Sequence, residues 1–214
     1  MSRYTGPSCK KCRKVSQKLF LKGSKCATNC IVDKKQKASR DKKFSGGGPG
    51  GMKKMSDYGK HLREKQIARL MAQVTEAQFR RFFDKASKDK GKTGEALLRF
   101  LEVRLDNVVR RVGFAISMKA ARQLVNHGHI RVNGRQVDIP SFLVKPGDTI
   151  NIDPKKAQSP LVKLGLENAE KGAPRPSFLS WDAATMTGKM TRWPDRGEVS
   201  ISVDEQLIVE FYSK

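Results

Sequence analysis

Apolar side chains recur with a helical period between residues 57 and 112. The pattern predicts a first helix capped by Asp57 and a second that begins at Thr75. A third is expected to open at Thr93 and to end at Gly113, a residue suited to a helix C-terminus. The residues that recur at helical spacing are Tyr58, Leu62, Leu70, Met71 and Val74 in the first helix, then Phe79, Phe82, Phe83 and Ala86, an apolar stripe expected in the core, then Leu97, Leu98, Leu101, Leu105, Val108, Val109 and Val112, which are expected to be buried.

Between residues 117 and 152 the period shortens from helical to alternating. Ser117 is expected to cap a helix over residues 118–127. The following Asn133-Gly134 pair, with alternating apolar residues on both sides, is typical of a β-hairpin. A second turn precedes another short strand at residues 149–152. The pattern predicts two helices packed on a short, mostly antiparallel sheet.

The last part of the chain predicts a helix from Ser159-Pro160, then irregular strands and loops over residues 178–193. A short acidic helix after Asp204 is expected to pack back onto the first helical domain. The predicted class is α+β. The predicted divisions are a basic N-terminal segment at 1–45, a helical domain at 46–103 joined by 198–214, and a small α/β domain with an extension at 104–197.

The charge of the chain indicates that the function of this predicted fold is binding. Lys and Arg number 44 against 21 Asp and Glu, so the net charge is +23. Such an excess indicates a polyanionic partner, nucleic acid first. No apolar run approaches the ~18 residues that span a membrane, and the first residues lack the apolar core of a secretory signal. We therefore expect no membrane partner and a cytosolic location.

All four cysteines fall close together near the N-terminus, where the chain is too polar to fold by packing alone. Their spacing, C-x2-C-x13-C-x3-C, predicts a metal site in which four thiolates surround one ion. Zinc is the default ion, and a [4Fe-4S] cluster uses the same ligand type. Two disulfides or four free thiols are the alternatives, and a cytosolic location argues against the disulfides. The expected ligands are Cys9, Cys12, Cys26 and Cys30.

Five glycines between residues 46 and 51, flanked by lysines, indicate a linker whose bare backbone approaches phosphates. A linker without a fixed contact is the alternative. Catalysis is not expected, because the chain has three histidines, no Walker or dinucleotide glycine signature, and no cysteine left over as a nucleophile if all four bind metal.

Two segments, RLDNVV and ARQLVNHGHIRVNGRQVDIPSFLVKPGDTI, resemble the RNA-binding domain first described in the family of small-subunit ribosomal protein four. The opening MSRYTGPSCKKC, the block SDYGKHLREKQ at 56–66 and the closing EQLIVEFYSK at 205–214 are similar to bacterial members of that family along essentially the whole chain. This sequence departs from the family at Met118, where an arginine is common, and in the loop at 46–51.

The resemblance implies a structural protein that binds 16S rRNA at a multi-helix junction of the 5′ domain early in assembly of the 30S body. It further implies contacts with small-subunit protein five and other 30S proteins, a position on the path by which mRNA enters, and a contribution to translational accuracy. The residues expected to contact RNA are Arg104, Asp106, Arg110, Arg111, Ser117, Lys119, Arg122, Gln123, Asn126, His127, Arg131, Asn133 and Gly134, with Arg3, Tyr4, Lys53, Lys54, Tyr58, Lys60, Arg63 and Lys65 nearer the N-terminus.

A second function remains open at this point. RNA-modifying and tRNA-handling proteins use the same small domain as an accessory module. That alternative requires a catalytic domain in addition to the RNA-binding domain at 104–152, and nothing in the rest of the chain resembles one.

Overall fold

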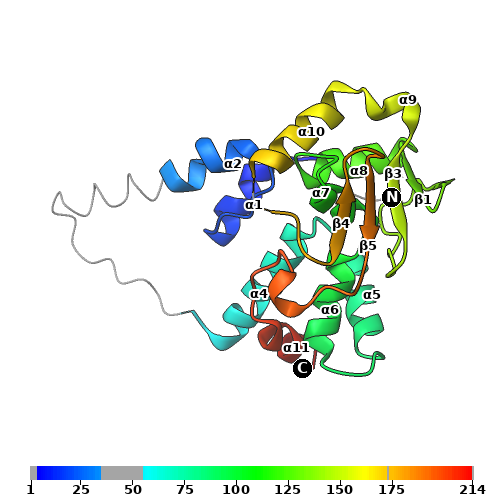
Figure 1. The fold of residues 1–214 in the computed structure, drawn as a ribbon. Helices are drawn as coiled ribbons and strands as arrows, with labels where there is room; N and C mark the ends of the chain where they lie inside the picture. The colour runs from blue at the N-terminus through cyan, green and yellow to red at the C-terminus, as the bar shows by residue number, and fades with distance from the viewer. Residues whose placement is uncertain (1–3, 35–54, 173, 214) are drawn as a thin grey trace. The chain divides into compact units, whose positions relative to one another are not determined.

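The computed structural model describes residues 4–34, 55–172 and 174–213. It divides into two compact units, each of which is described here by itself (Figure 1). Unit 1 contains the chain up to Thr75 together with the residues from Val203 on, and unit 2 is Glu76–Ser202. Among the described residues, no helix is long and apolar enough to cross a membrane.

Unit 1 is helical and is built from segments far apart in the sequence. The acidic C-terminal helix packs against α4, as the tail sequence led us to expect. The backbone N–H of Asp204 donates to Glu64, and Ile208 is fully buried. Helix α4 begins after Ser56, whose hydroxyl accepts the N–H of Gly59 at 3.2 Å, so the N-cap is one residue earlier than predicted. The named helices of unit 1 are α1 (Ser8–Val15), α2 (Ser24–Thr28), α4 (Asp57–Met71) and α11 (Glu205–Ser213).

Unit 2 contains an antiparallel sheet with the strand order β2-β1-β3-β5-β4. The first hairpin is confirmed: Asn133 and Gly134 both adopt positive φ (51° and 78°), which a tight two-residue turn requires. The predicted irregular strands of the tail join the same sheet, with Thr149 opposite Lys189. The strands are β1 (Ile130–Val132), β2 (Arg135–Gln136), β3 (Thr149–Ile152), β4 (Leu179–Asp182) and β5 (Thr187–Met190). The predicted α+β class, with helices on a mostly antiparallel sheet, is confirmed.

Helices supply the rest of the core of unit 2 (Figure 1). Val109, Val125 and Ile150 are fully buried in one apolar cluster that joins α7, α8 and the sheet. Gly165 of α10 lies so close to the backbone of Phe114 that a Cβ would come within 2.8 Å of it, so only glycine allows this helix approach. The helices are α5 (Glu76–Ala86), α6 (Thr93–Glu102), α7 (Leu105–Val112), α8 (Met118–Asn126), α9 (Pro154–Ala157) and α10 (Pro160–Lys171), with a 3-10 turn η1 (Arg196–Glu198).

The third predicted helix is in fact two helices, and the prediction of one continuous helix from Thr93 is wrong. α6 ends at Glu102, and Arg104 has an extended backbone with ψ 139°. The N–H of Leu105 donates to the carbonyl of Phe142 at 2.8 Å, and Arg104 forms an isolated bridge with Leu143. The chain thus leaves helical geometry to bond a distant segment, which the local apolar period does not reveal.

The division between the units also differs from the predicted domain boundary at residue 103. α5 and α6 pack together and belong with the sheet in unit 2. One contact that joins them to the following segment is the Arg104 guanidinium, which lies 5.5 Å from the ring centre of Phe82.

Candidate nucleic-acid interface

One carboxylate at the start of α7 holds two arginines that the sequence suggested as RNA contacts. Asp106 accepts from Arg104 at 3.0 and 2.8 Å and from Arg122 at 3.0 and 2.6 Å. The side chain of Asp106 is 0% exposed, that of Arg104 1% and that of Arg122 12%. The predicted RNA contacts of Arg104 and Asp106 are therefore corrected, because both side chains are enclosed in the protein. Arg122 is committed to the same carboxylate rather than projecting from α8.

A second buried carboxylate engages the arginines at the end of α7. Glu102 is fully buried, lies 2.7 Å from Arg111 and accepts the hydroxyl of Ser200 at 2.9 Å. Arg110 donates to Asn107 at 2.9 Å, and burial lowers the pKa of its guanidinium. Arg110 and Arg111 therefore connect α6, α7 and the segment at residue 200, while both remain partly exposed, so their RNA contacts stay a prediction.

Helix α8 presents one exposed polar face. Its members recur at helical spacing, so they lie along one side of the helix while Leu124 and Val125 point into the core. A lysine, an amide pair and a histidine supply both phosphate-binding charge and hydrogen-bonding groups for base edges. This exposed face consists of Lys119, Gln123, Asn126 and His127, all four of which the sequence predicted.

Ser117 has a structural task at the start of this helix. Its hydroxyl accepts the N–H of Ala120 at 3.3 Å. Met118 beside it is 6% exposed, so its position in this chain faces the core rather than an RNA. The departure from the family pattern at Met118 therefore places an apolar side chain where the fold buries it.

Replacing Ser117 by alanine is expected to cost about 1 kcal/mol of unfolding free energy, because the capping bond is lost. RNA affinity should stay within about twofold of the original if capping is the main role of Ser117. Denaturant unfolding and RNA titration of the same variant check both statements. A large affinity loss without a stability change would instead assign Ser117 to the RNA.

The hairpin and the turn beside it are tied by Asn133. Its amide donates to Asp148 at 2.8 Å and its carbonyl accepts the N–H of Thr149 at 2.9 Å. Gly134 remains exposed at the tip, whereas Arg131 pairs with Asp153 at 3.2 Å. Asn133 thus shapes the hairpin end, and four exposed cations that we did not predict lie in the hairpin, in the turn before β3 and in the segment after β3. These are Arg135, Lys145, Lys155 and Lys156, and clustered lysines near Pro154 were the available sequence signal.

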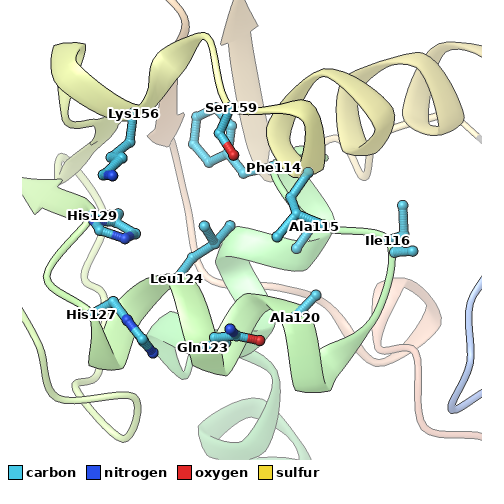
Figure 2. Close-up of a pocket in the computed structure, with 11 residues that line it drawn as sticks. Phe114, Ala115, Ile116, Ala120, Gln123, Leu124, His127, His129, Lys156 and Ser159 are labelled. Atoms are coloured by element: carbon cyan, nitrogen blue, oxygen red, sulfur yellow. The ribbon is translucent and has the colours of Figure 1, made fainter.

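A pocket of about 120 Å³ opens beside the exposed face of α8. Gln123, His127 and Lys156 lie on one side of it, and the apolar side chains of Ala115 and Ala120 on the other (Figure 2). The rings of His127 and His129, which flank Gly128, have centres 5.8 Å apart. His129 and Lys156 were not among the predicted site residues.

Some of the predicted RNA contacts in unit 1 are side chains that pack or bond within the protein, and others are exposed. Lys65 is 5% exposed and lies 4.2 Å from the ring centre of Phe211, so its predicted RNA contact is corrected to a packing role. Arg63 donates to the carbonyl of Val15 at 3.3 Å, which links α4 to α1. Tyr58 is exposed, and Lys60 is exposed but paired with Asp57 at 2.8 Å. Arg3, Lys53 and Lys54 lie outside the described residues.

A basic pocket of about 330 Å³ lies between α1 and α4. Tyr4 is exposed at its edge, with the Lys11 ammonium 4.3 Å from its ring centre. No carboxylate is among its described lining residues. The sequence prediction named only Tyr4 here, although the charge run of the N-terminus was visible. The cations that line this pocket are Lys10, Lys11, Lys14 and Arg69.

The four cysteines lie in one part of unit 1. Burial raises the pKa of the Cys12 thiol, and the neighbouring charges of Cys26, Cys9 and Cys30 raise it further, while the N–H of Leu19 lowers it. The N–H of Lys22 also points at the Cys26 sulfur, at 3.3 Å. Cysteines that interact electrostatically, and whose sulfurs accept hydrogen bonds from backbone N–H groups, are chemically suited to a thiophilic ion. Within the described ranges, however, no three metal-binding side chains are already arranged around a common point.

Comparison with known proteins finds similar sequences along the whole chain. Residues 3–102 match the family described as the ribosomal protein S4/S9 N-terminal domain, and residues 103–150 match the S4 domain. Proteins named small ribosomal subunit protein uS4 from Acetivibrio thermocellus and Natranaerobius thermophilus are each 49% identical, and that from Acidobacterium capsulatum is 47% identical. Each match covers 100% of both chains, which favours the ribosomal prediction over the accessory-module alternative. The chain belongs to the family of small ribosomal subunit protein uS4.

Proposed function

We propose that this protein is a structural constituent of the small ribosomal subunit and acts by binding rRNA rather than by catalysis. The observation that carries the proposal is the exposed face of α8, where Lys119, Gln123, Asn126 and His127 lie together within the matched S4 domain. Cations of that face and of the basic pocket in unit 1 neutralise phosphates, and the shape of the folded RNA supplies selectivity.

The same proposal extends to the finer role expected of the family. The protein binds a multi-helix junction in the 5′ domain of 16S rRNA early and thereby organises the 30S body in the cytoplasm. It contacts small-subunit protein five and lies on the path by which mRNA enters, which is how it contributes to accuracy. The net charge of +23 supports the early, RNA-directed step, because such a surface needs a polyanion before it packs against other proteins.

Footprinting of the full chain on small-subunit rRNA tests this proposal. Protection is expected at one junction of several helices, with an affinity that falls with added salt at a log–log slope of several units. A Lys119→Gln variant should lower that slope by about one unit, since one phosphate contact is lost. Protection of tRNA alone, or a flat salt response, would contradict it.

We propose further that Cys9, Cys12, Cys26 and Cys30 hold one zinc ion, which when bound would fix the N-terminal segment. The alternative occupant of the same thiolates is a [4Fe-4S] cluster. The location of the four cysteines within one part of unit 1 and the two N–H groups directed at Cys12 and Cys26 support the idea. In the absence of an ion these thiols only pack, so the metal is what would make this polar segment rigid.

Metal analysis of the chain purified without chelator is expected to give about one zinc per chain and a colourless sample. Cys12→Ser should lose the ion, whereas Ser24→Ala, a change beside the same thiols, should keep it. A brown sample with visible absorption identifies the cluster instead. A chain that is soluble, reduced and free of metal would rule out both the zinc ion and the cluster.

A further inference from the structure

The pocket beside α8 has one polar edge and one apolar edge. Figure 2 shows Lys156, His129 and His127 following one another along one edge, with Gln123 beside His127. Leu124 lies at the centre, and the apolar edge is opposite. The polar members are Gln123, His127, His129, Lys156 and Ser159, and the apolar ones are Phe114, Ala115, Ile116, Ala120, Leu124 and Leu161.

Size and charge restrict what this pocket can hold. Its volume of about 120 Å³ is below the ~300–1,000 Å³ of ordinary small-molecule sites, so a single ring rather than a whole cofactor fits. No carboxylate is among the described lining residues. Asp153, the acid whose charge acts on His129, pairs with Arg131 and accepts the N–H of Lys155. Lys155 and Lys163 are exposed on α9 and α10. Because these lysines are positively charged, the group attached to a ring bound in the pocket is expected to be anionic.

The polar edge offers hydrogen-bond donors and acceptors. Burial lowers the pKa of the His129 imidazole, and the charges of Lys156 and His127 lower it further against the opposing effect of Asp153. A neutral imidazole carries one donor and one acceptor, and the Gln123 amide carries both types as well. This combination matches the edge of a nucleobase, which also presents donors and acceptors in one plane. The apolar edge of the pocket matches the flat faces of a nucleobase.

We propose that this pocket receives one unpaired nucleobase of the bound RNA. Gln123 and His127 contact its hydrogen-bonding edge, Ala120 and Leu124 contact its face, and Lys156 contacts an adjoining phosphate. The inference rests on the proposed rRNA binding and adds to it a base-reading position. An apolar side chain from a protein partner fits less well, because it would leave the imidazoles and the amide covered and without partners.

Equilibrium binding of the full chain to a small-subunit rRNA transcript, measured at several salt concentrations, separates base from phosphate contacts. Gln123→Ala and His127→Ala change exposed side chains, so the fold should be kept. Each is expected to weaken binding by about 5- to 100-fold at constant salt slope, the range for losing contact with one base. Lys156→Gln should instead lower the slope by about one unit. Gln158→Ala, an exposed glutamine outside the pocket, is the matched control and should have no effect.

Chemical probing of the same complexes with base-specific reagents identifies the base. One nucleotide outside any helix should be protected at its Watson–Crick edge by the original chain and become reactive with Gln123→Ala. Losses below about twofold in both pocket variants, or no such nucleotide, would overturn the inference and leave the pocket to a protein partner. If the original chain does not select this transcript at all, the proposed function itself fails, which is a different result.

Discussion

Replacing Asp106 by alanine is expected to lower the free energy of unfolding of unit 2 by about 3–5 kcal/mol, the usual cost of breaking a buried ion pair. The carboxylate is fully buried and is shared by Arg104 and Arg122. Its removal leaves the Arg104 guanidinium, which is 1% exposed, enclosed without its counter-charge. The break between α6 and α7 depends on the same residues, so the damage should spread to the strand contact at Leu143.

Denaturant unfolding followed by tryptophan fluorescence measures this change directly, because both tryptophans, Trp181 and Trp193, belong to unit 2. The control is Lys92→Ala, which breaks the Lys92–Glu95 pair where the lysine side chain is 83% exposed. Exposed pairs contribute about 0–1 kcal/mol, so the control should change little. If the two variants were equally stable, the Asp106 cluster would not be the structural centre that its burial indicates.

Replacing Phe114 by alanine is expected to cost about 3–5 kcal/mol, the range for emptying the site of a buried aromatic ring. Phe114 is 0% exposed and packs edge-on against Trp181, with ring centres 5.4 Å apart. Its backbone is also the surface that Gly165 of α10 approaches. The cavity is therefore held open by two elements and cannot collapse freely, which puts the cost toward the upper end.

The same fluorescence assay applies, and the emission of the folded state should also change, since Trp181 loses its aromatic neighbour. Phe142→Ala is the matched control, because Phe142 is 37% exposed and leaves no closed cavity. A Phe114 variant that unfolds at the denaturant concentration of the original would show that α10 does collapse onto the vacated space.

Much of unit 2 was predictable because its elements are short and each carries its own local signal. The Asn133-Gly134 turn fixes the first hairpin through positive φ values, and Ser117 marks the start of α8. Lys119 and Gln123 were predicted on the polar side of α8, because a 3.6-residue period separates them from the buried Leu124; Arg122, predicted on the same side, is instead held by Asp106. These inferences use only neighbours in the chain.

The errors share a different physical origin. Three predicted RNA contacts, Arg104, Asp106 and Lys65, are enclosed in the protein, and three more, Arg110, Arg111 and Arg122, are paired within it while still partly exposed. A charged residue on a helix reads in the sequence as solvent-facing, since burying it alone is costly. Here each has a partner that comes from elsewhere in the chain or from the next turn, and no composition or period specifies that partner. Conversely, His129 reaches the pocket from the turn after α8 and Lys156 from α9, so only their folded positions associate them with Gln123.

The sequence by itself determined most of the helices and strands, the α+β class, the excess of positive charge and the family, because periodicity, turn chemistry and composition are local or summed properties of the chain. The tertiary structure decided which charges remain available for RNA, where α6 gives way to α7, and which side chains gather at one pocket. These depend on contacts between residues far apart in sequence, such as Glu102 with Ser200 and Leu105 with Phe142, whose energies outweigh local preference. The positive charge of the chain was thus predicted correctly, while the division of its arginines between the protein core and the RNA surface required the fold.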